Sequence, residues 1–410
     1  MQILGIIAEF NPFHNGHLIF CNASRQAVGA DYTVAVMSGC FVQRGEPAVC
    51  DKPARVEMAL HAGVDLVIEL PVYYTAASAE HFAGAAVRLL DSLGVVTRLS
   101  FGTESGDLET LLAISRASLQ LDSRENFSDI LRGFLSQGLP YARAREQTLR
   151  TILRIEPDFI RQPNHILALE YLNALERLNS PIVPCAVRRV GPGHHDPSLG
   201  AIASATALRQ AIARGDTAAL QKAMPESAFD LLAAALARSG PAWMNNFSQL
   251  FQYLIKTKEE SDLSEILDMN EGLENRMIRF AGQYEMLEDI LAAVKTKRYP
   301  LTKLRRAALH LLLNIRGDDF DRFNRLGGPQ YIRVLGFRKE TAGPLLRAIK
   351  RKARLPLVMN LKRAEAALSE DARRMLRKEI QATDIYYLAC AHKKDTLEKN
   401  QEYRVPLVMI

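Results

Sequence analysis

The chain has 410 residues, of which 48% are hydrophobic and 24% are charged, a balance typical of a folded rather than a disordered protein. This length exceeds what one ordinary hydrophobic core supports, so we expect two or three domains. The 52 Lys and Arg against 46 Asp and Glu leave a net charge of +6, which permits a polyanionic partner but does not require one. The five cysteines form no C-x-x-C pair, which argues against a disulfide framework or a zinc knuckle and favours the cytoplasm. No uncharged apolar run reaches the roughly 18 residues of a membrane-spanning helix.

Strand and helix patterns alternate through the first part of the chain. Predicted strands occupy 3–8, 32–37, 65–70 and 99–102, and the predicted helices between them occupy 17–28, 52–61 and 78–93. Such alternation, with strands that are nearly continuous apolar runs, predicts a parallel sheet covered by helices on both faces. Ligands of such sheets bind at the carboxyl ends of the strands, so the loops there are the first place to look for a site.

The rest of the chain has a different pattern. Helices predicted at 108–156 and 164–178 are followed by a strand at 182–188 and a helix at 205–213. From 216 to 354 the pattern is almost wholly helical, and the β-branched and aromatic residues of 383–390 and 403–410 indicate a return to a small sheet. We therefore predict an α/β domain at 1–213, a helical domain at 214–375 and a C-terminal segment at 376–410 that packs back on the first domain.

The strongest chemical signal is an H-x-G-H motif, His14-Asn15-Gly16-His17, placed directly after the first strand and at the start of the first helix. Gly16 allows close approach of a ligand, and the free N–H groups and positive dipole end of the helix attract phosphate. His14 and His17 are three residues apart, so both rings can face one side and donate to phosphate oxygens. The alternative is two surface histidines near a turn, but the position at the end of a sheet strand favours a phosphate site.

A second element lies at the end of the predicted α/β domain. Ser204, Thr206 and Arg209 open a helix, either as an ordinary N-cap with a surface arginine or as a second phosphate clamp. Together, the H-x-G-H motif and this late S-x-T-x-x-R element resemble the paired signature of the nucleotidylyltransferase superfamily. That resemblance implies a Rossmann-like parallel sheet and catalysis by His14, His17, Ser204, Thr206 and Arg209. The superfamily works at the α-phosphate of a nucleoside triphosphate, releases pyrophosphate and forms no covalent enzyme intermediate.

Longer segments resemble one family within that superfamily, the bacterial tRNA(Met) cytidine acetate ligases. They include GIIAEFNPFHNGH (5–17), MSGCFVQRGEPAVCDKPAR (37–55), FGTESGD (101–107), QPNHILALEYLNAL (162–175), GPGHHD (191–196) and KTKRYPLTKLRR (295–306). The resemblance implies that acetate attacks ATP to give acetyl-adenylate, and that the wobble cytidine of elongator methionine tRNA then takes the acetyl group. Mg²⁺ is expected with ATP. Two departures are Cys40, where asparagine is expected, and His194, where an aromatic residue is more usual.

The resemblance also implies an ATP site. Its residues are Ile7, Ala8, Glu9, Phe10, Asn11, Pro12, Phe13, His14, Asn15, Gly16, His17, Leu18, Ile19, Phe20, Gly102, Asn164 and Arg189. Gly102 ends a strand where adenosine needs room, although a plain turn glycine is the alternative. Asn164 is either a ribose or base contact or a simple N-cap. Arg188 and Arg189 end a strand and point to opposite sides, so one of them can reach phosphate, and the resemblance favours Arg189.

Other polar residues are weaker candidates. A polar loop and helix start after the second strand either line the pocket for acetate or the target base, or are simply solvated. Their residues are Gln43, Arg44, Glu46, Lys52 and Arg55. Two acids after the fourth strand, Glu104 and Asp107, are candidates for holding Mg²⁺, but two acidic residues in a loop usually have no such role, so we predict no metal ligands from the protein. For His194, His195 and Asp196 we prefer a loop turn or a substrate contact over zinc, because no further ligand has suitable spacing.

Basic clusters point to RNA. The predicted tRNA contacts are Lys295, Lys297, Arg298, Arg305 and Arg306, with a further basic group at 347–354. Tyr299 lies among the first set, where its ring would stack on a base. By themselves these clusters are better explained as solvated helix faces, but the upstream resemblance to a tRNA-modifying enzyme favours contacts with phosphate. An alternative function is an adenylyltransferase acting on a small phosphorylated metabolite, but such enzymes are usually compact and lack so long a basic helical region. An inactive RNA-binding scaffold would predict degraded phosphate motifs, whereas all five catalytic candidates are present.

Overall fold

The computed structural model describes residues 1–119, 127–138, 144, 147–148, 150–152, 159, 162–189, 200–390 and 398–410. Within them the main sheet has eight strands, in the order β10-β8-β5-β2-β1-β6-β7 with β9 paired to β8. Their bounds are β1 Ile3–Ala8, β2 Tyr32–Ser38, β5 Leu66–Leu70, β6 Arg98–Thr103, β7 Val183–Arg188, β8 Ile332–Phe337, β9 Leu357–Val358 and β10 Val408–Met409. A separate hairpin pairs β3 (Phe41–Val42) with β4 (Glu46–Pro47).

The strands predicted in the first part of the chain are confirmed. β1, β2, β5, β6 and β7 run parallel. The chain steps outward from β1 to β2 and β5, then returns to β6 on the other side of β1. The carboxyl ends of β1 and β6 therefore flank a topological switch point, where ligands of open α/β sheets bind.

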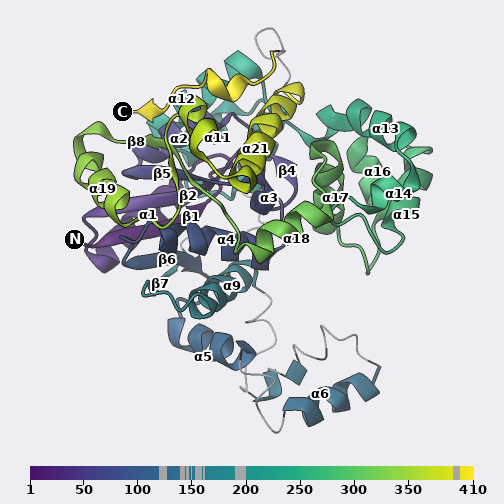
Figure 1. Cartoon of the computed structure of the whole chain (residues 1–410), viewed down its shortest axis with the longest axis horizontal. Coiled ribbons are helices and arrows are strands. Elements are labelled where there is room, and N and C mark those ends of the chain that lie inside the picture. Colours follow the sequence, from purple (N-terminus) through teal and green to yellow (C-terminus); the bar gives the residue numbers. More distant parts are fainter. Residues whose placement is uncertain are drawn as a thin grey trace.

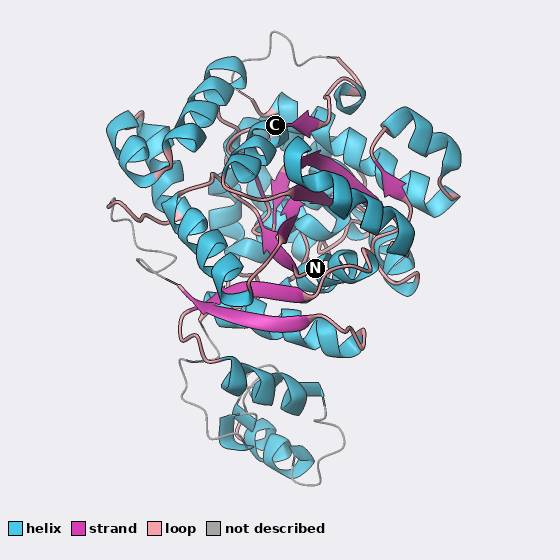
Figure 2. Ribbon diagram, turned by 90° about the vertical axis from the view of Figure 1, so that its left-hand side faces the viewer, coloured by secondary structure: helices cyan, strands magenta, loops and turns pink. Residues whose placement is uncertain are grey.

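Helices cover both faces of this sheet, as Figures 1 and 2 show. Successive residues of β1 and β2 enter opposite cores: Ile3 and Val34 on one side, Leu4 and Ala35 on the other. The first core contains α4 (Ala79–Ser92) and α9 (Pro163–Arg177). The second contains residues of α1 (Asn15–Val28), α2 (Lys52–His61), α10 (Ala205–Arg214), α11 (Thr217–Ala223) and α12 (Glu226–Ser239). Burial on both faces explains why these strands are continuous apolar runs.

A helical lobe extends to one side of the sheet (Figure 1). Its elements are η2 Met244–Phe247, α13 Ser248–Thr257, α14 Glu260–Ser264, α15 Leu273–Ala281, α16 Leu287–Val294, α17 Leu301–Leu313 and α18 Gly317–Arg325. The remaining helices are α3 Val72–Thr75, α5 Leu108–Leu119, α6 Phe127–Ser136, α19 Lys339–Lys352, α20 Leu361–Ala367, α21 Glu370–Leu388 and η3 Gln401–Tyr403. No helix of the described residues combines the length and apolar character needed to cross a membrane.

Two predictions of secondary structure are wrong. The segment 216–354 is not wholly helical, because Ile332–Phe337 forms β8, which pairs antiparallel with β5. Residues 383–390 are not a strand but mostly the end of α21, whose buried residues Met375, Glu379 and Tyr386 follow helical rather than alternating spacing. The return of the C-terminus to a sheet is confirmed by β10, although it joins the main sheet beside β8. The domain boundaries after 213 and 375 stay a prediction.

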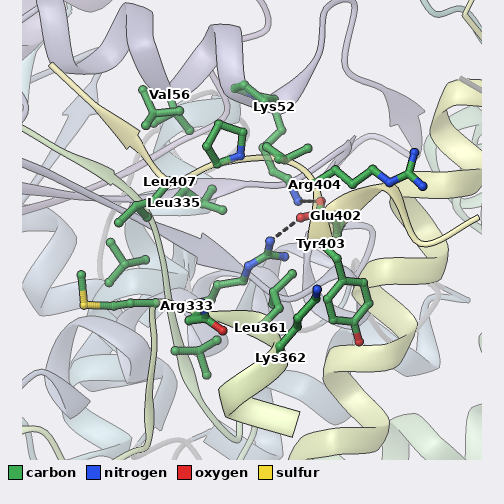
Figure 3. Close-up of a pocket in the computed structure, with 18 residues that line it drawn as sticks. Lys52, Val56, Arg333, Leu335, Leu361, Lys362, Glu402, Tyr403, Arg404 and Leu407 are labelled. Atoms are coloured by element: carbon green, nitrogen blue, oxygen red, sulfur yellow. Dashed lines mark hydrogen bonds and ion pairs between the residues drawn. The ribbon is translucent and has the colours of Figure 1, made fainter. Parts of the chain in front are cut away.

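A buried ionic cluster lies where β5, β8, α2 and the C-terminal segment meet. It is formed by Lys52, Glu69, Arg333 and Glu402, each with at most 8% of its side chain exposed. Lys52 and Arg333 each form ion pairs with both carboxylates. Figure 3 shows Arg333 and Lys52 converging on Glu402 at the floor of a pocket of about 400 Å³. The cluster fixes the C-terminal segment to the sheet.

Candidate active site

A cavity of about 500 Å³ lies at the carboxyl edge of the sheet. It is lined by the β1–α1 segment, the β3–β4 hairpin, the ends of β6 and β7, the start of α9 and residues 202–209. Thr302 and Arg306 of α17 close its far side, so the helical lobe also contributes to the wall. The predicted residues that it brings together from distant segments include His14, His17, Gly102, Asn164, Arg189 and Arg209.

The H-x-G-H histidines form one unit at the start of α1. His14 is the extended N-cap residue of the helix, and its ring stacks on that of His17 with 3.7 Å between centroids. Phe10 and Phe13 pack against His17 and support it from the other side. A Cβ on Gly16 would lie 2.9 Å from the His14 ring. Gly16 therefore makes room for the His14 ring itself, a role that differs from the predicted close approach of a ligand.

Not all of the predicted segment 7–20 faces the cavity. Four residues of that segment are not part of the cavity lining: Pro12, Phe13, Asn15 and Leu18. Phe13 is fully buried, and Asn15 Nδ2 donates to the carbonyls of Ala201 and Lys222. These residues support the segment from behind, so a signature of consecutive residues overstates the number that can touch a ligand.

The second predicted phosphate element is fastened to the first. Ser204 caps α10, with its Oγ accepting a hydrogen bond from Ala207 N at 3.1 Å. Arg209 donates from Nη1 to the carbonyl of Asn11 at 3.0 Å, and from Nη2 to Thr206 Oγ1 at 3.4 Å. Ser204 and Arg209 line the cavity, while Thr206 acts on it through Arg209. The two motifs thus present two imidazoles and a guanidinium to one space, which suits a polyphosphate.

At the other end of the cavity, polar residues form a connected array. Arg189 Nη1 donates to Asn164 Oδ1 at 2.9 Å, and Asn164 Nδ2 donates to Glu104 Oε1 at 2.7 Å. A Cβ on Gly102 would lie 3.0 Å from Arg189 Cγ, so the glycine leaves space for that arginine. Sequence reasoning placed these residues near a nucleotide, but it missed that Glu104 orients Asn164.

The two acids considered for Mg²⁺, Glu104 and Asp107, are engaged with neighbouring residues. Glu104 accepts from both the backbone N–H and the side chain of Asn164. Asp107 Oδ1 accepts from Thr110 N, and hydrogen bonding to Thr110 lowers the pKa of Asp107. Among the described residues, no three His, Cys, Asp or Glu are grouped to hold a metal ion. We therefore derive no step through a protein-bound metal. The alternatives for His194, His195 and Asp196 stay predictions, because these residues lie outside the described part of the chain.

The predicted residues of the loop and helix start after β2 lie in two different places. Gln43, Arg44 and Glu46 line the cavity. Lys52 belongs instead to the buried ionic cluster, and Arg55 is fully buried with Nη1 donating to the carbonyls of Glu9 and Ser38 at 2.9 Å. The unexpected Cys40 is also buried and away from the lining, and burial raises its thiol pKa to about 12, so it is no nucleophile.

Glu46 joins the cavity to the helical lobe. Its Oε2 lies 3.7 Å from Arg209 Nη2, and its Oε1 forms an ion pair with Arg305 of α17. Arg305 also pairs with Glu288, Nη2 to Oε2 at 2.8 Å. Gly45, at φ +76°, lets the hairpin touch α17, because a Cβ there would lie 2.5 Å from Arg306 N. Sequence reasoning missed this bridge and proposed Arg305 for tRNA instead.

Of the other predicted tRNA contacts, Lys295, Lys297 and Arg298 are exposed. Arg306 is mostly buried, with Nε 3.5 Å from Asp268 Oδ2. Tyr299 is 5% exposed and its hydroxyl donates to the carbonyl of Glu271 at 2.6 Å, so its ring is not placed to stack on a base.

Known proteins share this architecture over the whole chain. A family model described as HIGH Nucleotidyl Transferase matches residues 1–402. The tRNA(Met) cytidine acetate ligase of Thermoanaerobacter sp. (strain X514) is 41% identical over 394 residues, which are 95% of this chain and 96% of the relative. The chain belongs to the tRNA(Met) cytidine acetate ligase family of HIGH nucleotidyl transferases.

Further tRNA(Met) cytidine acetate ligases agree with this result. The Acetivibrio thermocellus relative is 36% identical over 419 residues and covers both chains completely. The crystal structure of Thermotoga maritima TmcAL in its apo form I has a TM-score of 0.92 at 31% identity, covering 100% of both chains. The same protein bound with alpha-thio ATP has a TM-score of 0.90. The predicted fold class, a nucleotidylyltransferase sheet with an appended helical region, is confirmed.

Proposed function

We propose that this chain activates acetate with ATP and transfers the acetyl group to N4 of the wobble cytidine of elongator tRNA(Met). The observation that carries the proposal is the meeting of His14, His17 and Arg209 with the Asn164–Arg189 array in one cavity, in a chain whose full-length relatives bear that name. The proposed substrate assigns the reaction to the cytoplasm, where tRNA is found.

The first half-reaction is a substitution at phosphorus. A carboxylate oxygen of acetate bonds to the α-phosphorus of ATP, the bond to the β-phosphate oxygen breaks, and pyrophosphate leaves. Negative charge grows on the phosphoryl oxygens, where His14, His17 and Arg209 are held to stabilise it. Magnesium, if it enters with ATP, would be held chiefly by the phosphates rather than by a carboxylate cluster of the protein.

The second half-reaction needs the cytidine base in the same cavity. Its amine attacks the carbonyl carbon of acetyl-adenylate, and AMP leaves. Because α17 forms part of the cavity wall, we propose that the helical lobe presents the anticodon, with the exposed Lys295, Lys297 and Arg298 contacting phosphate.

Neutralising these three residues to glutamine tests the tRNA surface. We expect a higher KM for tRNA. We also expect a plot of log binding constant against log salt concentration to have a slope smaller in magnitude by about 2 to 3, because each of the three lost phosphate contacts contributes roughly 0.7–0.9 to that slope. The comparison variant neutralises Arg347, Lys350 and Arg351 of α19, which belong to the second basic group noted in the sequence and lie on the far side of the sheet from the lobe in Figure 1. Filter binding at several salt concentrations measures both. An equal effect of both variants would contradict the placement.

The Glu46 bridge gives a second prediction. In Glu46→Gln, Arg209 loses the carboxylate that orients it, and we expect acetyl-adenylate formation to slow by about tenfold, equivalent to roughly 1.4 kcal/mol in the transition state. Glu288→Gln is the control, because among the described residues the Glu288 carboxylate pairs with Arg305 and not with Arg209, and Glu288 lies outside the cavity lining. Acetate-dependent ATP–pyrophosphate exchange reports the rate. A larger loss in the control than in Glu46→Gln would contradict the orienting role.

The proposed function is tested by incubating the protein with ATP, Mg²⁺, radiolabelled acetate and elongator tRNA(Met) transcript. We expect label in the RNA that depends on ATP, and none in a transcript whose wobble cytidine is replaced by uridine. ATP consumption with no label in RNA would move the function to an adenylyltransferase acting on another small acceptor.

A further inference from the structure

Only two carboxylates line the cavity among the described residues, Glu9 and Glu46. Glu46 is held between the guanidinium groups of Arg209 and Arg305. Each of its carboxylate oxygens already faces an arginine, Oε2 that of Arg209 and Oε1 that of Arg305. Glu9 differs, because it forms no ion pair with a described residue.

Glu9 lies between the H-x-G-H segment and the β3–β4 hairpin. It directly follows β1 and precedes the H-x-G-H segment, and its side chain is partly accessible from the cavity. Its Oε1 accepts a hydrogen bond from Gln43 N at 2.6 Å, which joins it to the β3–β4 hairpin. Glu9 therefore faces both the phosphate-binding side and the hairpin that leads to α17.

We propose that Glu9 is the general base of acetyl transfer, the group that takes a proton from the attacking cytidine amine. This inference rests on the proposed function. The N4–carbon bond forms, the bond between the carbonyl carbon and the AMP oxygen breaks, and one N4 proton passes to the Glu9 carboxylate. The first half-reaction needs no such group, because acetate is already ionised at neutral pH. The two half-reactions should therefore depend on Glu9 to different extents.

The surroundings of Glu9 suit this role. Burial raises its pKa, and the effect is opposed by Gln43 N–H and by Arg44, Arg209 and Arg55. The cavity wall supplies the other charged or titratable groups, which are His14, His17, Glu46, Tyr171, Arg188, Arg189 and Arg306. A carboxylate whose pKa is shifted upward accepts a proton more readily near neutral pH. Since the base acts in its ionised form, the rate of acetyl transfer should rise with pH as Glu9 loses its proton.

Glu9→Gln separates this role from a structural one, because the amide oxygen still accepts from Gln43 N. We expect the ratio of single-turnover acetyl transfer to acetate-dependent ATP–pyrophosphate exchange to fall by about 10²- to 10⁴-fold, the range for loss of a general base. The variant should also lose the acidic limb of the pH profile of transfer. Glu46→Gln is the matched control, and there we expect exchange and transfer to fall together.

Two results would overturn the assignment. Equal loss of exchange and transfer in Glu9→Gln would mark Glu9 as structural, and an unchanged acidic limb would place the base elsewhere. A wild-type protein that exchanges pyrophosphate but never labels tRNA would instead remove the proposed function, and with it the step that Glu9 is assigned to. The wild-type reaction thus distinguishes the two failures.

Discussion

Replacing His17 by alanine is expected to slow acetate-dependent ATP–pyrophosphate exchange by about 10²- to 10³-fold, the usual cost of removing one preorganised donor to a developing charge. The His17 ring is fixed by stacking on His14 and by edge contacts with Phe10. An ordered water in its place would not be held so rigidly. The loss should appear in the rate of the first half-reaction, with and without tRNA.

His61→Ala provides the control for this variant. His61 lies at the end of α2 with 43% of its side chain exposed, and it is not part of the cavity lining. Its exchange rate should equal that of the wild type. Exchange at the wild-type rate in His17→Ala, with the same thermal unfolding midpoint, would remove His17 from catalysis.

The largest expected effect on stability comes from Glu402→Gln. Lys52 and Arg333 would each lose one of two carboxylate partners while remaining buried (Figure 3). Breaking a buried ion pair from one side costs about 3–5 kcal/mol, because an uncompensated charge is left in the interior. Urea unfolding of both proteins measures the difference.

The matched control is Glu398→Gln. Glu398 pairs with Arg404, and 57% and 69% of their side chains are exposed. Such surface pairs contribute about 0–1 kcal/mol. A loss in Glu402→Gln no larger than in this control would contradict a structural role of the cluster.

The same cluster predicts a pH dependence. Burial by itself would raise the pKa of Glu402, but Arg333 and Lys52 outweigh burial and hold it well below its usual range. The folded pKa is therefore lower than the unfolded one, near 4.3. The stabilisation by Glu402 is complete above that value and decreases as pH falls further, by at most about 1.4 kcal/mol per pH unit. Between pH 5 and 3, the free energy of unfolding of Glu402→Gln should therefore fall less than that of the wild type, by up to about 1.4 kcal/mol per pH unit below the unfolded pKa. Urea unfolding at several pH values measures this difference.

Local patterns predicted those parts of the molecule that local physics determines. The apolar runs of β1, β2 and β5 are buried on both faces, so composition alone revealed them. The H-x-G-H motif was visible because strand end, glycine and helix start are adjacent in sequence. The Ser204–Arg209 element was visible because a cap and an arginine one turn later share one helix face.

The remainder depends on contacts between distant segments. β8 forms because its residues pair with β5, 264 positions away in the case of Arg333 and Glu69. The ion pair between Glu46 and Arg305 spans 259 positions, and nothing near either residue signals it. Residues 383–390 have strand-like composition, but the burial of those in α21 follows a helical period. Local sequence patterns could not predict these features, because they carry no information about which distant residues pair.

Oxygen transfer from [¹⁸O]acetate most directly tests activation of acetate at the α-phosphate of ATP. If a carboxylate oxygen attacks the α-phosphorus and the acetyl carbon–oxygen bond later breaks, each turnover leaves one acetate oxygen in AMP. We predict, by mass spectrometry of the products with elongator tRNA(Met), one ¹⁸O per AMP and none in pyrophosphate. Label in phosphate released with ADP, or AMP without label, would contradict acetyl-adenylate as the intermediate.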